Sequence, residues 1–285
     1  MNGILLLDKP EGWTSHDAVA KLRGLTRERR IGHSGTLDPM ATGLLVVFVG
    51  RATRAVEFAE ADRKEYHASL RLGLTTDTLD ITGTVLRETE TSITRAQLEA
   101  VLPRFAGKQE QIPPMYSAIK QNGRKLCDIA RSGGEVERPA RHIEIYSIAC
   151  TGEEDGDFKL SVLCSKGTYI RSLCADIGEA LGCGGCMSAL RRVSAGAFSL
   201  DSAHTLEEIA EQGAERYLLP VDGLFKAYPA LTIGEAAEKS ARVGADFSLD
   251  AEDGDYRVYG SNGEFLLLGR EVGGRMHTIK SFFEV

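Results

Sequence analysis

The sequence predicts an α+β protein, a larger domain of mixed helices and strands followed by a small β module. Amphipathic helices and apolar strands are interspersed over most of the chain, which favours one mixed domain. Near residue 226 the composition shifts, and short strands dominate from there to the end. A length of 285 residues suits one large domain with a small appendage. We therefore predict two domains, residues 1–225 and 226–285.

In the first part of the chain, apolar runs and turn residues mark the elements. Thr14 or Ser15 is placed to cap a helix that starts after Gly12. A turn-rich segment with two acids, TTDTLDITG, occupies residues 75–83. Strands are expected at 3–10, 44–50 and 65–76.

A second helix is predicted over 91–108, where Thr94 and Gln97 form a capping box. The following segment, 109–142, mixes Pro-Pro, Asn-Gly and Gly-Gly pairs with basic residues, and a long segment of this kind is usually functional or disordered. Within it a short helix is expected at 124–131. Further elements are expected as strands at 142–150 and 158–167, helices at 168–182 and from Thr205 with Glu208, a hairpin at 256–272 and a last strand at 276–285.

The charge distribution is uneven along the chain. Residues 1–200 carry 26 Lys and Arg against 25 Asp and Glu, whereas residues 201–285 carry 8 against 16. Basic residues cluster at 21–30 and at 120–142. Such local patches can bind phosphates even when the net charge is negative, here -7. A solvated basic face explains the same pattern, so charge alone leaves both interpretations open.

The apolar runs indicate the cell compartment of the protein, and the cysteines indicate whether it binds a metal ion. The chain has no apolar run of the roughly 20 residues that would span a bilayer, and its start lacks the basic segment of a signal peptide. We expect a cytoplasmic protein without a membrane partner. Its six cysteines include one C-x-x-C pair, Cys183 and Cys186, but no matching second pair, so we expect no metal site.

One acidic residue, Asp38, lies in a Gly-Thr-Leu-Asp-Pro turn directly before an apolar run. An Asp before Pro commonly forms an Asx-turn, which gives it a structural role. Alternatively, a single carboxylate can act as a nucleophile if a cation keeps it ionised. Arg171, expected early in a helix where a cation opposes the helix dipole, is a candidate for that cation.

Six blocks of sequence carry a resemblance to a known family. They occur in the order GILLLDKPEGWTSHDAV, GHSGTLDPMATGLLVVFVGRATR, KEYHASLRLGLTTDTLDITG, PPMYSAIKQNGRKLC, CSKGTYIRSL and ALRRVSAG. Together they resemble the bacterial tRNA pseudouridine synthase B (TruB) family closely over residues 1–200. The remainder is loosely similar to that family's C-terminal RNA-binding β module of the PUA type.

The resemblance implies a pseudouridine synthase fold, with a curved, mainly antiparallel mixed sheet flanked by helices. It implies isomerisation of uridine-55 in the T loop of tRNA to pseudouridine, with the target base flipped out of its stack. The reaction involves no redox step and no group donor, so no cofactor is expected. The expected partner is the T-arm stem-loop of tRNA, and a monomer is the default state.

The resemblance also assigns roles to individual residues. Asp38 matches the catalytic aspartate, Arg171 the arginine that pairs with it, and Tyr66 a tyrosine that stacks on the base and is a candidate for proton transfer. The segment 109–142 matches a mobile insertion that closes on RNA. Residues implied in RNA binding are His33, Arg54, Arg141, Lys166, Tyr169 and Leu190. Arg54 stands where family members often carry a lysine.

Three other functions compete with this prediction. A synthase of the same superfamily could act on another RNA. An RNA-binding or tRNA-folding module with decayed catalytic residues would keep the blocks but lack the reaction, and the intact set of Asp38, Tyr66 and Arg171 argues against it. A guide-RNA-dependent relative is disfavoured because this chain has the bacterial type of insertion at 109–142.

Overall fold

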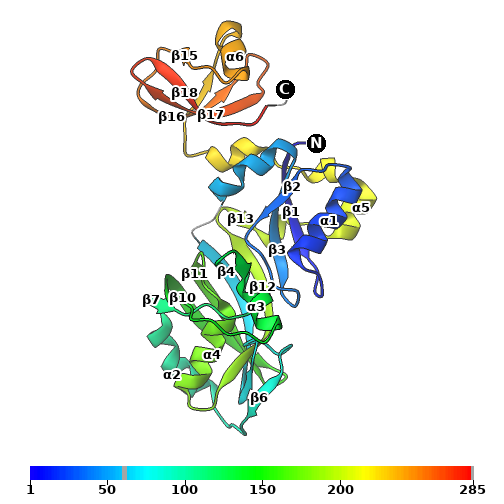
Figure 1. Cartoon of the computed structure of the whole chain (residues 1–285), viewed down its shortest axis with the longest axis vertical. Coiled ribbons are helices and arrows are strands. Elements are labelled where there is room, and N and C mark those ends of the chain that lie inside the picture. The colour runs from blue at the N-terminus through cyan, green and yellow to red at the C-terminus, as the bar shows by residue number, and fades with distance from the viewer. Residues whose placement is uncertain (60–62, 284–285) are drawn as a thin grey trace.

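A nine-stranded sheet runs through the larger domain of the computed structural model, which describes residues 1–59 and 63–283 (Figure 1). Its main path has the order β1-β3-β12-β4-β11-β10-β7, with β2 pairing to β3 and β13 to β12. The strands are β1 Gly3–Lys9, β2 Ile31–Ser34, β3 Thr42–Val49, β4 Arg63–Leu72, β7 Gly107–Gln111, β10 Arg141–Glu154, β11 Asp157–Ser165, β12 Gly185–Ala195 and β13 Phe198–Ser199. Among these pairs only β3 and β12 run parallel, which confirms the predicted mainly antiparallel mixed sheet.

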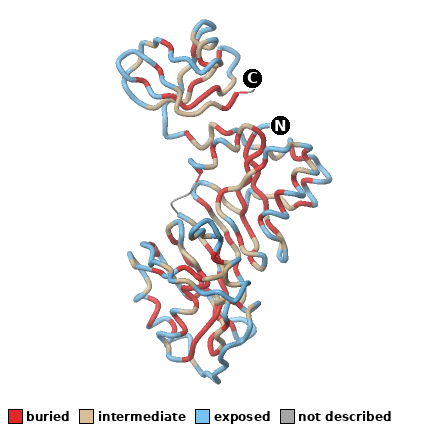
Figure 2. The backbone as a smooth tube through the Cα atoms, in the orientation of Figure 1, coloured by how far each residue is buried: buried red, intermediate tan, exposed pale blue. Residues whose placement is uncertain are grey.

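The apolar runs of β1 and β3 are continuous because both faces of this part of the sheet are covered. Leu5 faces Val47 across the strand pair, and both belong to a core shared with helix α1, Ser15–Thr26. The other face packs on the 3₁₀ segment η1, Gly50–Ala59, and on residues near the C-terminal end of the chain. Figure 2 shows this part of the sheet as largely buried.

The predicted helix caps are confirmed, but one predicted helix is too long. Thr14 caps α1 in a box with Asp17, and Thr205 caps α5, Leu206–Gln212. Thr94 caps α2, yet α2 covers only Arg95–Val101 and gives way to the 3₁₀ turn η2, Leu102–Phe105. Pro103 explains the difference, because a proline inside a helix removes a hydrogen bond and clashes with the preceding turn.

Several elements were not predicted. Strands β2 and β12, segment η1, and the 3₁₀ turns η3 Leu200–Ser202, η4 Ala214–Tyr217 and η5 Val221–Phe225 belong to the larger domain. A short hairpin of β5, Leu74–Thr76, and β6, Val85–Glu88, frames the turn-rich segment. Helix α4, Ile170–Ala180, packs on the sheet as the apolar periodicity of 168–182 predicts.

The basic segment leaves the sheet after β7 and returns at β10. Gln111 and Arg141, its two flanking residues, are cross-strand partners, so 109–111 and 141–142 of the predicted segment are in the sheet and 112–140 form the excursion. The excursion holds β8 Lys120–Gln121, β9 Arg124–Lys125 and α3 Leu126–Arg131. Helix α3 confirms the short helix expected at 124–131.

A separate five-stranded sheet near the C-terminal end forms the predicted β module. It has the order β14-β16-β17-β18-β15 and carries one helix, α6 Glu235–Arg242, that was not predicted. The strands are β14 Ala230–Thr232, β15 Phe247–Ser248, β16 Gly254–Tyr259, β17 Phe265–Val272 and β18 Arg275–Ser281. The predicted hairpin is β16 and β17, and the last predicted strand ends at Ser281, while residues 284–285 lie outside the described part of the chain.

The module joins the larger domain through an apolar core. Leu268 and Phe282 of the module pack in one cluster with Ile4 and Phe48 of the large sheet and Phe225 of η5. The module therefore stands at one end of the molecule, against η1 and the N-terminal strand (Figure 1). None of the described helices is long and apolar enough to cross a bilayer.

Candidate active site

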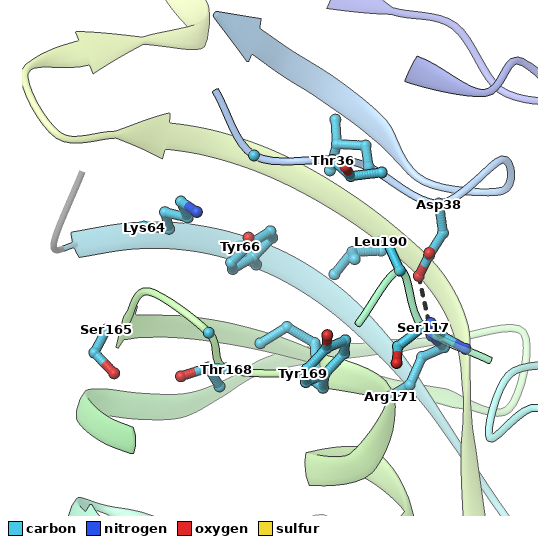
Figure 3. Close-up of a pocket in the computed structure, with 15 residues that line it drawn as sticks. Thr36, Asp38, Lys64, Tyr66, Ser117, Ser165, Thr168, Tyr169, Arg171 and Leu190 are labelled. Carbon is cyan, nitrogen blue, oxygen red and sulfur yellow. Dashed lines mark ion pairs between the residues drawn. The ribbon is translucent and has the colours of Figure 1, made fainter. Parts of the chain in front are cut away.

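A cavity of about 270 Å³ lies where the loop after β2, strand β4, the start of α4 and the root of the excursion meet (Figure 3). Of the predicted site residues, the structure brings Asp38, Tyr66, Tyr169, Arg171 and Leu190 together in its wall. The rest of the lining is Gly35, Thr36, Leu37, Lys64, Ser117, Ala118, Ser165, Gly167, Thr168 and Ile170. Because small-ligand sites usually measure about 300–1,000 Å³, this cavity suits something as small as one nucleobase.

Asp38 is presented to the cavity by a loop that several hydrogen bonds hold in place. The Ser15 hydroxyl donates to the carbonyl of Leu37 at 3.1 Å and accepts from its amide at 2.9 Å. The ammonium of Lys9 donates to the carbonyls of Pro39 at 3.3 Å and Trp13 at 2.6 Å. The start of α1 and the end of β1 therefore fix the loop that carries Asp38.

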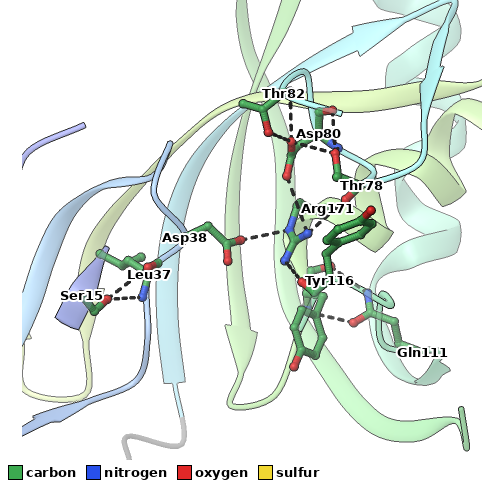
Figure 4. Close-up of polar contacts among 10 residues, drawn as sticks. Ser15, Leu37, Asp38, Thr78, Asp80, Thr82, Gln111, Tyr116 and Arg171 are labelled. Atoms are coloured by element: carbon green, nitrogen blue, oxygen red, sulfur yellow. Dashed lines mark hydrogen bonds and ion pairs between the residues drawn. The ribbon is translucent and has the colours of Figure 1, made fainter. Parts of the chain in front are cut away.

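Arg171 is the cation predicted for Asp38. Its Nε lies 3.0 Å from Asp38 Oδ2, and only 5% of its side chain is exposed (Figure 4). Its two terminal nitrogens donate to the carbonyls of Thr78, at 3.0 Å, and Tyr116, at 2.7 Å. One guanidinium thus ties together the Asp38 loop, the turn after β5 and the root of the excursion.

A second carboxylate, Asp80, also belongs to this network and was missed. Its Oδ2 lies 3.6 Å from Arg171 Nη1, and its side chain is 7% exposed. Its Oδ1 accepts hydrogen bonds from the hydroxyls of Thr78, at 2.9 Å, and Thr82, at 2.6 Å, which hold the carboxylate in place. The signal was present in the two acids of the 75–83 turn, but nothing in the sequence paired that turn with Arg171.

Opposing effects set the protonation of Asp38. Burial raises the pKa of the Asp38 carboxyl above its usual value, and the nearby charge of Asp80 adds to this rise. The charges of Arg171 and Lys9 act in the other direction. Burial also lowers the pKa of Lys9 to about 8, and the negative charge of Asp38 is the strongest influence that opposes this change. The result is a more basic carboxylate held beside a guanidinium.

Two tyrosines and a leucine supply the apolar walls. Tyr66 on β4 is buried. Leu190 on β12 pairs with Ala68, which lies two residues along β4 from Tyr66 and so on the same face of the sheet. Tyr169 precedes α4, and its backbone amide and carbonyl both bond to the side chain of Gln111, at 2.8 and 3.0 Å. Burial raises the pKa of both phenols. Aromatic and aliphatic walls of this kind can hold a planar base by stacking.

The other predicted RNA-binding residues lie outside this cavity. Lys166 and Arg141 line a second cavity of about 380 Å³, which shares Lys64 with the first. His33, on β2, is partly buried, and burial lowers its pKa. Arg54, on η1, donates to the hydroxyl of Ser281 in the β module at 2.6 Å. Two of the four therefore adjoin the site, and two lie elsewhere.

The described residues contain no group of three or more His, Cys, Asp or Glu side chains arranged to hold a metal ion. All six cysteines are free thiols. The Asp38 carboxylate lies in a small, partly apolar cavity, with Arg171 fixed beside it. This arrangement can deliver a nucleophile to a flat ring or to the sugar attached to it.

Comparison with known proteins agrees with this geometry. Residues 23–170 match the model of the TruB family pseudouridylate synthase N-terminal domain, and residues 171–226 match the tRNA pseudouridylate synthase B C-terminal domain. The chain is 42% identical over 279 residues to tRNA pseudouridine synthase B of Clostridium perfringens, covering 95% of each protein. It is 44% identical over 256 residues to tRNA pseudouridine synthase B of Bacillus subtilis, covering 86% of this chain and 83% of the relative.

Two solved structures share the whole architecture. A Cbf5-Nop10-Gar1 complex contains a chain that is 27% identical, with a TM-score of 0.72, over 99% of this chain and 85% of that one. An H/ACA RNP bound to a substrate RNA containing 2'-deoxyuridine gives a TM-score of 0.70 at 25% identity, with the same coverage. The predicted resemblance is thereby confirmed, and this chain belongs to the TruB family of pseudouridylate synthases, a family of isomerases.

Proposed function

We propose that this enzyme isomerises uridine-55 in the T loop of tRNA to pseudouridine, with Asp38 as the catalytic nucleophile. The observation that carries the proposal is the Asp38 carboxylate, 3.0 Å from the buried guanidinium of Arg171, in the wall of a base-sized cavity. The names of the relatives in Clostridium perfringens and Bacillus subtilis, both tRNA pseudouridine synthase B, support tRNA as the substrate.

The reaction requires the uridine to leave the stacked loop. Extrusion costs a few kcal/mol, and stacking of the base on an aromatic ring returns about 1–3 kcal/mol. We propose Tyr66 for this contact, and its position in the lining of the same cavity as Asp38 supports the proposal. The base then parts from the ribose at N1, turns within the cavity and is rejoined through C5.

Asp38 supports this exchange as a carboxylate. Attack by one of its oxygens on the ribose C1′ or on a ring carbon would give a covalent adduct that holds the reacting parts together. Arg171 keeps the carboxylate oriented by its direct ion pair, and its own position is fixed by two backbone carbonyls. Every atom of the base is retained, so the reaction needs no redox partner and no group donor.

Basic residues near the site can contact the phosphates of the RNA backbone. Lys166 and Arg141 line the cavity next to the one that holds Asp38, and the excursion at 112–140, which lines the Asp38 cavity with Ser117 and Ala118, carries further basic residues. RNA loops are recognised by shape, stacking and phosphate contacts, which suits a T-arm stem-loop. We infer that the excursion and the PUA-like module at 226–285 contribute to binding rather than to chemistry, and that the enzyme acts as a cytoplasmic monomer.

Conversion of an unmodified T-arm stem-loop RNA, followed by nucleoside analysis, tests the proposal. Asp38→Asn and Asp38→Ala should both abolish pseudouridine formation, while affinity for the RNA stays within a few-fold because binding is spread over many contacts. The alanine variant guards against deamidation of the asparagine back to aspartate.

A matched control is Asp176→Asn, the same chemical change on α4 at a residue outside the cavity lining, which should convert the RNA at the wild-type rate. If both Asp38 variants remain as fast as wild type, Asp38 is only a turn residue and the proposal is wrong. Failure of the wild-type enzyme with the T-arm RNA, together with conversion of another RNA, would instead point to a different target.

A further inference from the structure

Two charged side chains of the larger domain are fully buried, Lys9 on β1 and Arg192 on β12. Arg192 is the larger of the two. It has no measurable exposure and is the largest fully buried side chain among the described residues. Its Nε donates to the carbonyl of Leu44 at 2.6 Å, and its Nη2 donates to the carbonyl of Gly35 at 3.1 Å. Its third nitrogen, Nη1, makes no geometrically satisfactory hydrogen bond, and no acidic side chain forms an ion pair with it in the described part of the chain.

If only the stability of the fold mattered, a guanidinium at this position would be unfavourable. Removing a charge from water costs free energy that neutral carbonyls only partly return, and an apolar residue of similar volume would usually serve the core better. The neighbouring backbone does not explain the choice of an arginine. Gly43, its partner across the parallel β3–β12 pair, has φ +97, and a Cβ there would run into the backbone of Arg192, so this close approach is the same for any residue at position 192. The packing alone gives Arg192 no evident purpose.

On the other side of β12, Arg192 has Tyr66 of β4 as its neighbour. Arg192 and Tyr66 are direct cross-strand partners on β12 and β4, so their side chains leave the sheet on the same face, with Cβ atoms typically about 4.5–5.5 Å apart. Tyr66 reaches the cavity that holds Asp38, whereas Arg192 does not line it. Burial raises the pKa of the Tyr66 phenol, and the positive charge of Arg192 acts against that rise.

Resting on the function proposed above, we propose that Arg192 is a positioning residue, which holds the Tyr66 phenol and stabilises its phenolate as the acceptor of the C5 proton. Once C5 is bonded to C1′, it still carries its original hydrogen. The phenolate oxygen takes that proton, the C5–H electron pair forms the C5=C6 bond, and the C6=N1 pair moves onto N1. N1 then takes a proton from water, and the phenol returns its proton to the hydroxide formed, so nothing is gained or lost.

Other charged and titratable groups surround this pair. The Lys64 Nζ and Arg192 Nη1 both lie beside Gly35, at 3.0 and 3.4 Å from the position that a Cβ would take there. Asp38 and Cys164, across the cavity and on β11, disfavour ionisation of Tyr66. The positive charge of Arg192 also lowers the pKa of His33 and of Lys9. The charge of Arg192 therefore favours the phenolate, against Asp38, Cys164 and burial.

The test uses full-length enzyme with 3-fluorotyrosine at position 66, whose phenol ionises more readily and reports ionisation by fluorine NMR. Arg192→Gln should move that titration to higher pH, and Arg192→Lys should move it less because the charge remains. In the enzyme with ordinary tyrosine, Arg192→Gln should slow single-turnover conversion of T-arm RNA at least 10-fold at neutral pH. The rate should recover as the pH rises, and fluorotyrosine should restore part of the loss.

A purely structural role predicts otherwise. The loss would then be the same at every pH, fluorotyrosine would restore nothing, and the fluorine titration would stay in place. Any of these results overturns the proposal. If Arg192→Gln does not fold, the Lys variant decides by the same titration and pH profile. The NMR titration needs no turnover, so an unmoved titration in an active enzyme refutes the role of Arg192 while leaving the proposed function intact.

Discussion

Replacing Asp80 with Asn tests whether the second carboxylate serves the site or only the fold. The change keeps the size and one oxygen for the hydroxyls of Thr78 and Thr82, but it removes the negative charge 3.6 Å from Arg171. Coulomb's law with an effective dielectric constant of about 20 gives 332/(20 × 3.6), or about 4.6 kcal/mol, for the lost attraction. Removing one partner of a buried pair typically costs about 3–5 kcal/mol, which agrees.

Only part of this energy should appear in the rate. The carbonyls of Thr78 and Tyr116 still hold two nitrogens of Arg171 in the variant. We expect the guanidinium to lose part of its alignment with Asp38, at about 1.4–2.7 kcal/mol, which corresponds to a 10- to 100-fold slower single turnover. The remainder should appear as a lower free energy of unfolding in urea.

The pH profile separates the two roles. The charge of Asp80 helps to raise the pKa of Asp38, so its removal should lower that pKa and move the acid limb of activity to lower pH. The assay is single-turnover conversion of T-arm RNA at saturating enzyme, measured across the acid range. A variant that is less stable in urea, yet converts RNA within two-fold of wild type with an unmoved acid limb, would refute the reasoning and leave Asp80 a structural residue.

Other perturbations give further tests. Asp38→Asn should raise the melting temperature at neutral pH, because the folded state raises the pKa of Asp38 and so disfavours its charged form. The gain should vanish in acid below the pKa of Asp38 in the unfolded chain. An unchanged melting temperature at both pH values would contradict this. Arg171→Lys should slow conversion less than Asp38→Asn, because the charge remains and the planar fork is lost, and an equal loss would show that charge alone is not enough. Residues 112–140 should gain hydrogen-exchange protection on binding T-arm RNA, and equal protection would count against closure on RNA. Phe282→Ala should cost about 3–5 kcal/mol of stability in urea, since the ring is buried between module and domain, and a neutral result would mean the module docks loosely.

Elements specified by neighbouring residues were predicted from the sequence. The capping boxes at Thr14, Thr94 and Thr205 need only residues three apart, and all three helices begin directly after these caps. The early end of α2 also has a local cause, Pro103, which the apolar periodicity of the segment obscured.

Some elements whose burial depends on distant partners were not predicted. Strand β12 contains two arginines, and only its place beside β4 explains why Arg192 is buried there. Helix α6 contains no large apolar side chain and buries only Ala241, so its sequence lacks the apolar face by which the other helices were recognised. The same limit applies to the site. Asp38 and Arg171 could be proposed as partners because each was unusual in its own segment, but Asp80 joins them only through the folded turn after β5.

The excursion between β7 and β10 has a consequence for protein engineering. It departs and returns at a single cross-strand pair, Gln111 and Arg141, so its length can change without altering the sheet, and loop closure adds only about 0.6 kcal/mol per doubling. The segment can thus be treated as a replaceable cassette. One of its attachments to the rest of the domain, the carbonyl of Tyr116, lies at the proposed active site, because it accepts from Arg171, the partner of Asp38. Grafts from other proteins that preserve the chain path at this residue should keep the reaction while changing which RNA shapes are admitted.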